Sequence, residues 1–491
     1  MYYPTLDETK QLAPRGNLIP ISLDINADLE TPVSAYLKVA KAPYSFLLES
    51  VEGGEYLARY SFIGTEPESL IITGEGYKDG ASDPLRLVED LLAEFKLIDT
   101  GDLPKFSGGA VGYLSYETSG YFEDIPSAEN DVLGLPESVL MLTKTFLIFD
   151  HVSHRIRIVS HAYIEDDVER AYNDAVSRIQ AIVSRLDKPL DPSSINTGSG
   201  YESGPTLSNM EKSHHKYMVE KCKEYVVDGE VIQTVVSQRF SRQTSADPFH
   251  IYRSLRAVNP SPYMYYLDLD GFQIVGASPE MLVQVQNGIV STHPIAGTRP
   301  RSPDADEDVR LEAELRSDEK EQAEHIMLLD LGRNDVGRVS TPGTVSATEV
   351  MEIERYSHVM HLVSHVEGQL SDDYSNYDAL RACFPAGTVS GAPKIRAMQI
   401  ISDLERDKRG PYAGAVGYFD FAGNMDTAIA IRTLVVKDGM AHAQAGGGIV
   451  YDSQPESEYD ETVHKAGALM RAIDEAEKTV RGGRSDDPSD R

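Results

Sequence analysis

PYSFLLE at residues 43–49 returns as PYMYYLD at residues 262–268, and two further pairs follow in the same order: IGTEPESL (63–70) with VGASPEML (275–282), and GAVGYL (109–114) with GAVGYF (414–419). One such match arises by chance, but three in one order indicate a duplicated unit. The second member of the third pair lies much further along in its half of the chain than the first member does. We therefore expect a duplicated fold, with chance matches between turn-rich strands as the alternative.

Runs of β-branched and aromatic residues predict strands joined by short turns, as between Val285 and Val290. Consecutive hairpins favour antiparallel sheets over βαβ units. The expected fold class is α+β, with duplicated antiparallel β-sheets stacked as a sandwich and helices on the outside. The segments expected as strands are 69–73, 139–149, 155–160, 272–275 and 427–436, and those expected as long helices are 306–332 and 462–480.

The length of 491 residues exceeds what one simple core supports, so two halves are expected. A stretch rich in Pro, Ser and Gly at 188–206 is typical of a junction. We therefore predict an amino-terminal half over 1–200, a catalytic half over 201–481 and a frayed tail over 482–491.

The charge balance excludes several classes of protein. With 46 Lys+Arg against 78 Asp+Glu, the formal net charge is -32, which argues against nucleic acid as a partner. Two Cys cannot build a disulfide framework, and no apolar run is long enough to span a membrane. So few cysteines suit a reducing compartment, so a cytoplasmic location is expected, and the first residues lack the basic-then-apolar layout of a signal peptide.

Two pairs of acidic residues stand at helical spacing. Glu321 and Glu324 are three residues apart, as are Glu458 and Glu461, with Lys465 four residues further on. Facing carboxylates repel unless a cation lies between them, and an all-oxygen ligand set suits Mg²⁺. The alternative is that either pair lies on a solvated helix face.

One further segment is rich in glycine, and another is rich in histidine. Three glycines at 446–448 allow close approach to the backbone and could bind an anion, or could simply form a tight bend. In the stretch that holds His358, His361 and His365, the strand pattern makes a zinc site improbable. One acting histidine is plausible, and a structural role is the alternative.

Taken together, these segments resemble the chorismate-utilising enzyme family, over roughly residues 210–475. The amino-terminal half, with LLES (47–50), RYSFIG (59–64) and GGAVGYLSYE (108–117), is similar to the first part of anthranilate synthase component I. The segments that carry the likeness in the second half are NPSPYMYY (259–266), GASPEML (276–282), PIAGTR (294–299), KEQAEHIMLLDLGRNDVGRV (320–339), MHLVS (360–364), FPAGTVSGAPK (384–394), GPYAGAVGY (410–418) and AGGGIVYDSQPESEYDETVHK (445–465).

Two positions indicate the branch of the family. Members that form isochorismate or salicylate carry a water-activating lysine where this chain has Gln233, and aminodeoxychorismate-forming members carry a lysine where it has Ala296. Lacking both, the chain resembles the anthranilate synthase branch. The alternatives are another chorismate enzyme and a catalytically inactive relative.

The resemblance implies a set of site residues. Glu324 and Glu461 would hold Mg²⁺, with Glu321 and Glu458 in the shell of bound water. Glu280 would be the general acid and His361 would assist pyruvate elimination, with Gln233 at the position that distinguishes the nucleophile. The substrate-binding residues would be Thr298, Thr388, Tyr412, Arg432, Gly446, Gly447, Gly448 and Lys465.

The resemblance also implies partners. Chorismate would be aminated with ammonia from a separate glutamine amidotransferase subunit, component II, in a heterotetramer with two copies of each subunit. L-Tryptophan would be a feedback inhibitor, as expected at the first step of tryptophan biosynthesis. Its site would combine Leu48, Glu49, Ser50 and Arg59 with Asn259, Pro262, Tyr263 and Met264.

Overall fold

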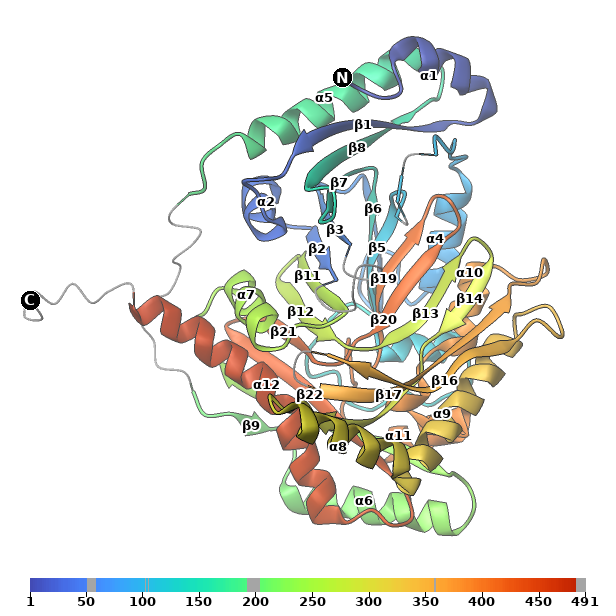
Figure 1. Ribbon diagram of the computed structural model, residues 1–491, viewed down its shortest axis with the longest axis vertical. Coiled ribbons are helices and arrows are strands. Elements are labelled where there is room, and N and C mark those ends of the chain that lie inside the picture. Colours follow the sequence, from blue (N-terminus) through green and yellow to red (C-terminus); the bar gives the residue numbers. More distant parts are fainter. Residues whose placement is uncertain (51–58, 102, 105, 192–203, 357–358, 483–491) are drawn as a thin grey trace, which may run out of the picture.

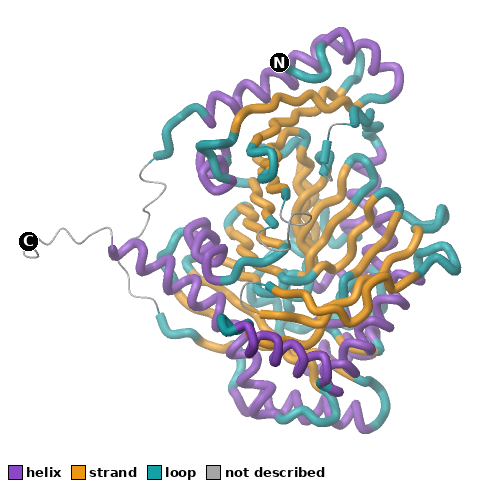
Figure 2. The backbone as a smooth tube through the Cα atoms, viewed as in Figure 1, coloured by secondary structure: helices purple, strands orange, loops and turns teal. Residues whose placement is uncertain are grey.

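Two large antiparallel sheets form the centre of the molecule, and helices lie around them (Figures 1 and 2). The computed structural model describes residues 1–50, 59–101, 103–104, 106–191, 204–356 and 359–482. The first sheet has the order β1 (Leu18–Asn26), β8 (Arg155–Tyr163), β7 (Thr145–Asp150), β3 (Tyr60–Thr65), β2 (Ser45–Glu49), β11 (Tyr263–Leu269), β12 (Phe272–Ser278), β21 (Thr433–Lys437), β22 (Met440–Ile449), β10 (Gln233–Gln243) and β18 (Gly391–Ala392), with β9 (Leu207–Ser208) beside β10.

The second sheet also contains strands from both halves of the chain. Its order is β15 (Ile295–Pro300), β17 (Val359–Gln369), β14 (Ile289–Thr292), β13 (Met281–Gln286), β20 (Met425–Ile429), β19 (Ala415–Asp420), β5 (Gly109–Leu114), β6 (Ser138–Thr143) and β4 (Ser69–Thr73), with β16 (Ser346–Arg355) beside β17. The α+β sandwich predicted from the sequence is therefore confirmed.

The helices pack mainly on the outer faces of the sheets. α5 lies along β8 and β1, and α12 and α7 lie over β22 and β12 (Figure 1). Their bounds are α1 (Leu6–Leu12), α2 (Pro32–Val39), α4 (Pro84–Ala93), α5 (Val168–Leu186), α6 (Lys212–Val227), α7 (Pro248–Val258), α8 (Ala305–Ser317), α9 (Glu319–Gly337), α10 (Asn376–Cys383), α11 (Lys394–Leu404) and α12 (Pro455–Gly482), with short 3₁₀ turns η1 (Ala13–Arg15), η2 (Tyr116–Tyr121) and η4 (Gly387–Val389).

The repeated segments pair with each other at the middle of each sheet. In the first sheet Leu47 lies opposite Tyr266, and these are the same position of the first repeat. In the second sheet Gly112 lies opposite Gly417, which are the same position of the third repeat. The two halves are thus related by an approximate two-fold axis that passes through both sheets. In the second half, the elements from β14 to α11 stand between β13 and β19, which explains why the third copy lies so far along the chain.

The repeats preserve one cross-strand contact in each half. Phe46 lies opposite Gly64 and Tyr265 lies opposite Gly276. A Cβ atom on Gly64 would lie 2.2 Å from the Phe46 ring, and one on Gly276 would lie 2.0 Å from the Tyr265 ring. Each aromatic ring therefore covers a glycine on the neighbouring strand, and only glycine leaves room for it.

Two predicted strands and one predicted helix are corrected. The segment 139–149 is two strands in different sheets, with Lys144 between them, and 427–436 is likewise divided between β20 and β21. The apolar pattern continues through both crossings because each strand is buried. The helix expected over 306–332 is two helices, because the Asp318 carboxylate caps α9 by accepting from the N–H groups of Lys320 and Glu321.

Other sequence predictions agree with the structure in part. Segment 69–73 is strand β4, the hairpin pairs Val285 with Val290, and 155–160 and 272–275 lie within longer strands. The division at residue 200 stays a prediction, since 192–203 lies outside the described residues, as does 483–491. Among the described helices, none combines the length and apolar character needed to cross a membrane.

We predict that Gly276→Ala lowers the free energy of unfolding by roughly 1–3 kcal/mol, because the added methyl displaces the Tyr265 ring from a packed core. Gly64→Ala should behave similarly, since Phe46 is displaced in the same way. Urea unfolding of both variants measures the effect. Gly120→Ala is the matched control because a Cβ there meets nothing within 4 Å. Equal stability of Gly276→Ala and the control would contradict this packing argument.

Candidate active site

A cavity of about 280 Å³ lies in the second half, between α9, α12 and the ends of β10, β15, β17 and β22. It brings together residues that are far apart in the sequence. Of the predicted catalytic, substrate-binding and metal residues, Glu321 and Gly447 are not among those that line it. Those that do are Gln233, Glu280, Thr298, Glu324, His361, Thr388, Tyr412, Arg432, Gly446, Gly448, Glu458, Glu461 and Lys465.

Glu280 is held in the turn between β12 and β13. Its N–H donates to the Ser278 hydroxyl at 3.3 Å, and its carbonyl accepts from the N–H of Ile429 at 3.1 Å. The residue is 8 % exposed. Burial raises the pKa of its carboxyl to about 8, against a hydrogen bond from Thr388 and the charge of Lys465. A carboxylic acid with this pKa is largely protonated at neutral pH and can donate a proton.

Carboxylates from two helices meet in the cavity. Burial raises the pKa of Glu324 on α9, and the charges of Glu321 and Glu461 raise it further. The pKa of Glu458 on α12 is also raised, by burial first and then by Glu461. Repulsion between these oxygens is what a divalent cation would relieve.

The predicted metal residues are nevertheless not all free for a cation. Glu461 forms an ion pair with Lys465 at 2.7 Å, and Glu321 pairs with Arg299 at 3.4 Å. Among the described residues, no three acidic, histidine or cysteine side chains are already gathered as a metal site. The oxygen-only donor set fits Mg²⁺, and binding would require the Lys465 ammonium to leave Glu461.

Two cationic side chains lie beside the carboxylates in the cavity. Lys465 Nζ donates to the carbonyl of Gly446 at 2.9 Å, and Arg432 Nη1 donates to the carbonyl of Lys465 at 2.8 Å. Arg432 has a left-handed backbone with φ of 52°, which costs roughly 1–3 kcal/mol in a residue with a side chain. The fold maintains this conformation where an anionic group would be bound.

Glycines 446 and 448 are required by close contacts on either side of β22. A Cβ on Gly446 would lie 2.7 Å from the Tyr412 hydroxyl, and one on Gly448 would lie 2.0 Å from Gln233 Nε2. The strand therefore leaves space for two side chains of the site. These close contacts with Tyr412 and Gln233 explain why glycine stands at both positions, as anion binding by the backbone also would.

His361 on β17 has a defined tautomer. Its Nδ1 lies 3.0 Å from the carbonyl of Gly297 and 3.0 Å from the hydroxyl of Thr298. Because a carbonyl only accepts, Nδ1 carries the hydrogen and Nε2 is left as an acceptor. Burial lowers the pKa of His361, so the ring is neutral. His358 lies outside the described residues.

Sequence reasoning missed two polar residues of the cavity, Lys320 and Gln444. Lys320 stands four residues before Glu324 on the same helix, so helical spacing could have identified it. Gln444 donates to the Ser237 hydroxyl at 2.8 Å across the β10–β22 pair, a contact that depends on strand register.

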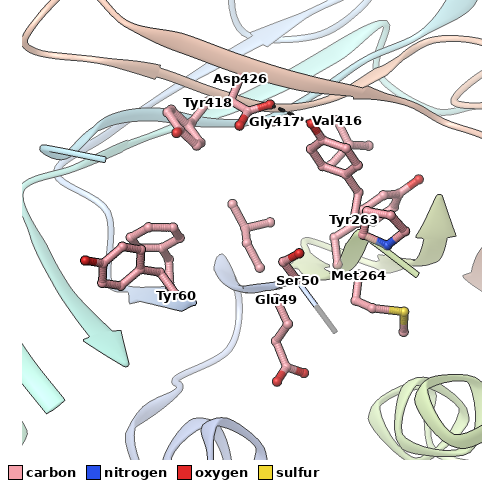
Figure 3. Close-up of a pocket in the computed structure, with 13 residues that line it drawn as sticks. Glu49, Ser50, Tyr60, Tyr263, Met264, Val416, Gly417, Tyr418 and Asp426 are labelled. Carbon is pink, nitrogen blue, oxygen red and sulfur yellow. Dashed lines mark hydrogen bonds between the residues drawn. The ribbon is translucent and has the colours of Figure 1, made fainter. Parts of the chain in front are cut away.

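A second pocket of about 100 Å³ lies between the two sheets (Figure 3), where the equivalent strands of the two halves pair beside the two-fold axis. Strands β2 and β11 of the first sheet and β19 and β20 of the second contribute to it. Six of the eight residues predicted for an inhibitor line it: Leu48, Glu49, Ser50, Pro262, Tyr263 and Met264. Arg59 does not, since it pairs with Asp150, and Asn259 instead ends α7 and donates to Ser261.

This pocket is largely aromatic, with polar groups at two ends. Tyr263 donates to Asp426 at 3.1 Å at one end, and Glu49 lies at the other (Figure 3). Glu49 is 4 % exposed, and its Oε2 accepts from Tyr252 and from Arg256. Among the described residues its Oε1 has no hydrogen-bond partner. The Glu49 side chain lies on the α7 face of β2 and points away from the other lining residues (Figure 3), so the pocket itself is an apolar slot.

The comparisons with known proteins agree with one another. Residues 44–471 match the family model of chorismate binding enzymes. The chain is 48 % identical to anthranilate synthase component 1 of Acetivibrio thermocellus, over 97 % of this chain and 99 % of that protein. Component 1 of Aquifex aeolicus is 45 % identical, over 97 % and 98 %.

Solved structures give the same result. The crystal structure of anthranilate synthase component I from Streptococcus pneumoniae superposes with a TM-score of 0.77 at 39 % identity, covering 91 % of this chain and 99 % of that one. The menaquinone-specific isochorismate synthase of Escherichia coli shares the fold, with a TM-score of 0.71 at 17 % identity, over 95 % and 98 %. The chain therefore belongs to the chorismate binding enzyme family and, within it, to the anthranilate synthase component 1 enzymes.

Proposed function

We propose that the chain aminates chorismate with ammonia to aminodeoxyisochorismate, and then eliminates pyruvate to give anthranilate, the first step of tryptophan biosynthesis. The observation that carries the proposal is Glu280, a buried acid with a pKa near neutrality, in one cavity with a cluster of carboxylates and two cationic side chains. This combination suits a dianionic substrate that must lose a hydroxyl group.

Glu324 and Glu461 would hold Mg²⁺, with Glu321 and Glu458 behind them, and the cation would bind the ring carboxylate. Burial and the neighbouring charges of Glu321 and Glu461, which together raise the pKa of Glu324, support this assignment. Lys465, released from Glu461, and Arg432 would bind the remaining carboxylate. Arg432 offers a planar pair of donors that a lysine could not.

In the first step Glu280 donates its proton to the C4 hydroxyl as the C4–O bond breaks, so water leaves. Ammonia forms a bond to C2 and then loses a proton. Gln233 is suited to orient ammonia. Its side chain donates a hydrogen bond to Glu324, and its Oε1 is buried without a partner among the described residues. An amide oxygen accepts an N–H and leaves the nitrogen lone pair free.

In the second step the C2 proton is removed, the bond between C3 and the enolpyruvyl oxygen breaks, and the methylene carbon gains a proton. His361 is suited to accept the C2 proton, since its neutral ring has Nε2 free. Thr298, Thr388, Tyr412 and the amides of Gly446 to Gly448 would bind the substrate around it.

Ammonia would come from a component 2 partner, because neither cysteine of this chain suits glutamine hydrolysis. Cys222 and Cys383 are buried, and burial raises the pKa of each thiol to about 12. A nucleophilic cysteine needs a lowered pKa and access to the substrate.

We predict that the isolated chain makes anthranilate from chorismate with ammonium and Mg²⁺, and makes none when glutamine replaces ammonium. Anthranilate fluorescence measures both reactions. Removal of the metal with a chelator should abolish turnover, and added Mg²⁺ should restore it. Glutamine-dependent activity of the pure chain, or ammonium-dependent activity unaffected by the chelator, would contradict the proposal.

We further propose that L-tryptophan binds in the pocket beside the two-fold axis and inhibits the enzyme. Its indole ring would lie in the apolar slot between the two sheets. Supporting this, six of the eight residues predicted for the inhibitor line this pocket, whose other walls are the aromatic rings of Tyr60, Phe62 and Tyr418.

We predict that Ser50→Arg abolishes inhibition by tryptophan, because the long side chain occupies the pocket, while ammonium-dependent turnover stays near the wild-type rate. The chain contains no Trp, so indole fluorescence in a titration reports bound ligand directly. Ser153→Arg, at an exposed serine outside the pocket, is the control. Unchanged inhibition of Ser50→Arg would show that the site is elsewhere.

A further inference from the structure

Next to Glu280 lies a second, smaller cavity of about 50 Å³ that the reaction described above does not use. Glu280, Leu328 and Thr388 line both this cavity and the candidate active site, so they form the wall between the two. The acid therefore stands at the boundary between the substrate's space and a separate compartment. The other residues that concern the argument are Thr292, Gly332 and Asp335.

The compartment contains a hydroxyl group without a partner among the described residues. Thr292 on β14 is 7 % exposed, and its Oγ1 is buried with no hydrogen-bond partner there. Thr388, at the wall, donates instead to the Glu280 carboxyl. A buried hydroxyl left unpaired costs free energy, so Thr292 favours a partner that occupies the cavity.

Gly332 keeps this space open. It lies in the interior of α9, where glycine costs about 1 kcal/mol relative to alanine. A Cβ atom on Gly332 would lie 3.1 Å from Thr292 Oγ1 and 3.3 Å from a Pro294 carbon. The unpaired hydroxyl is thus directed at a place where the helix lacks a side chain.

The compartment also borders a buried ion pair. Asp335 lines it, and Lys394 Nζ donates to Asp335 at 2.8 Å and to the carbonyl of Ala382 at 3.2 Å. Asp335 is 5 % exposed and Lys394 is 9 % exposed. Most of the lining is apolar, but Glu280, Thr292, His293, Asp335 and Thr388 also line the cavity, which gives a bound water enough polar partners.

We propose that this compartment holds water that returns a proton to Glu280 after each turnover, and that Thr292 is a positioning residue for that water. Glu280 loses its proton to the C4 oxygen, which leaves as water, and becomes a carboxylate. A water molecule in the compartment then donates a proton to the carboxylate and is itself reprotonated from solvent. The new amine at C2 releases one proton, which balances the proton taken up by the Glu280 carboxylate, so no net proton is consumed.

This inference rests on the proposed role of Glu280, and the test separates the two. Thr292→Val removes the hydroxyl with little change in shape, and Thr292→Ser keeps it. With saturating ammonium, we expect Thr292→Val to lower kcat about tenfold, leave KM for chorismate unchanged and increase the solvent deuterium isotope effect on kcat. Thr292→Ser should retain the wild-type kcat and isotope effect.

Gly332→Ala gives an independent measurement. Its methyl would lie 3.1 Å from Thr292 Oγ1 and displace a water from that hydroxyl, so kcat should fall, while the helix propensity of alanine offsets part of the crowding in Tm. Thr118→Val is the matched control, because Thr118 Oγ1 is also buried without a partner but lies outside both cavities. That variant should keep the wild-type kcat and isotope effect.

Three results would overturn the proposal: a wild-type kcat and isotope effect in Thr292→Val, an equal loss of kcat in Thr292→Val and Thr292→Ser, or a defect seen only with glutamine and the partner subunit. The last would indicate that the compartment conducts ammonia. Absence of turnover in the wild-type chain would contradict the proposed function itself.

Discussion

The pairing of equivalent strands across the two-fold axis is the constraint on which the rest of the structure depends. Leu47 against Tyr266 and Gly112 against Gly417 fix the register of both sheets at once. Because a shift by one residue would turn every side chain to the opposite face, this register determines which residues face the space between the sheets. The pocket between the sheets and the position of the turn that carries Glu280 both follow from it.

The same strands connect the two pockets. Tyr263, in the wall of the proposed inhibitor pocket, pairs with Ser278, whose hydroxyl accepts from the N–H of Glu280. Tyr263 also donates a hydrogen bond to Asp426 on β20. At the end of β20, the N–H of Ile429 donates to the carbonyl of Glu280. A ligand that shifts β11 against β20 therefore changes the support of the acid. This gives the proposed inhibition a physical route that needs no large movement.

The sequence was enough to predict the duplication, because Phe46 over Gly64 and Tyr265 over Gly276 require the same residue types in each half. It could not locate the crossings between sheets at Lys144 and after Ile429, since buried strands in either sheet have the same apolar pattern. The spacing of Glu321, Glu324, Glu458 and Glu461 predicted their helices, whereas the ion pairs of Glu461 and Glu321 depend on neighbours brought together by folding. The compartment behind Glu280 joins Thr292 to Gly332 across two elements, so no local pattern could reveal it.

The central claim is that burial keeps Glu280 protonated so that it can act as the acid. Its most direct test is kcat/KM for chorismate against pH, with the concentration of free ammonia held constant. A raised pKa keeps the acid form below about 8, so the wild-type value should fall as pH rises through that range. Glu280→Gln should be roughly 100-fold slower or worse, without that decline. A Glu280→Gln variant that keeps the wild-type rate, or that shows the same decline, would contradict the account.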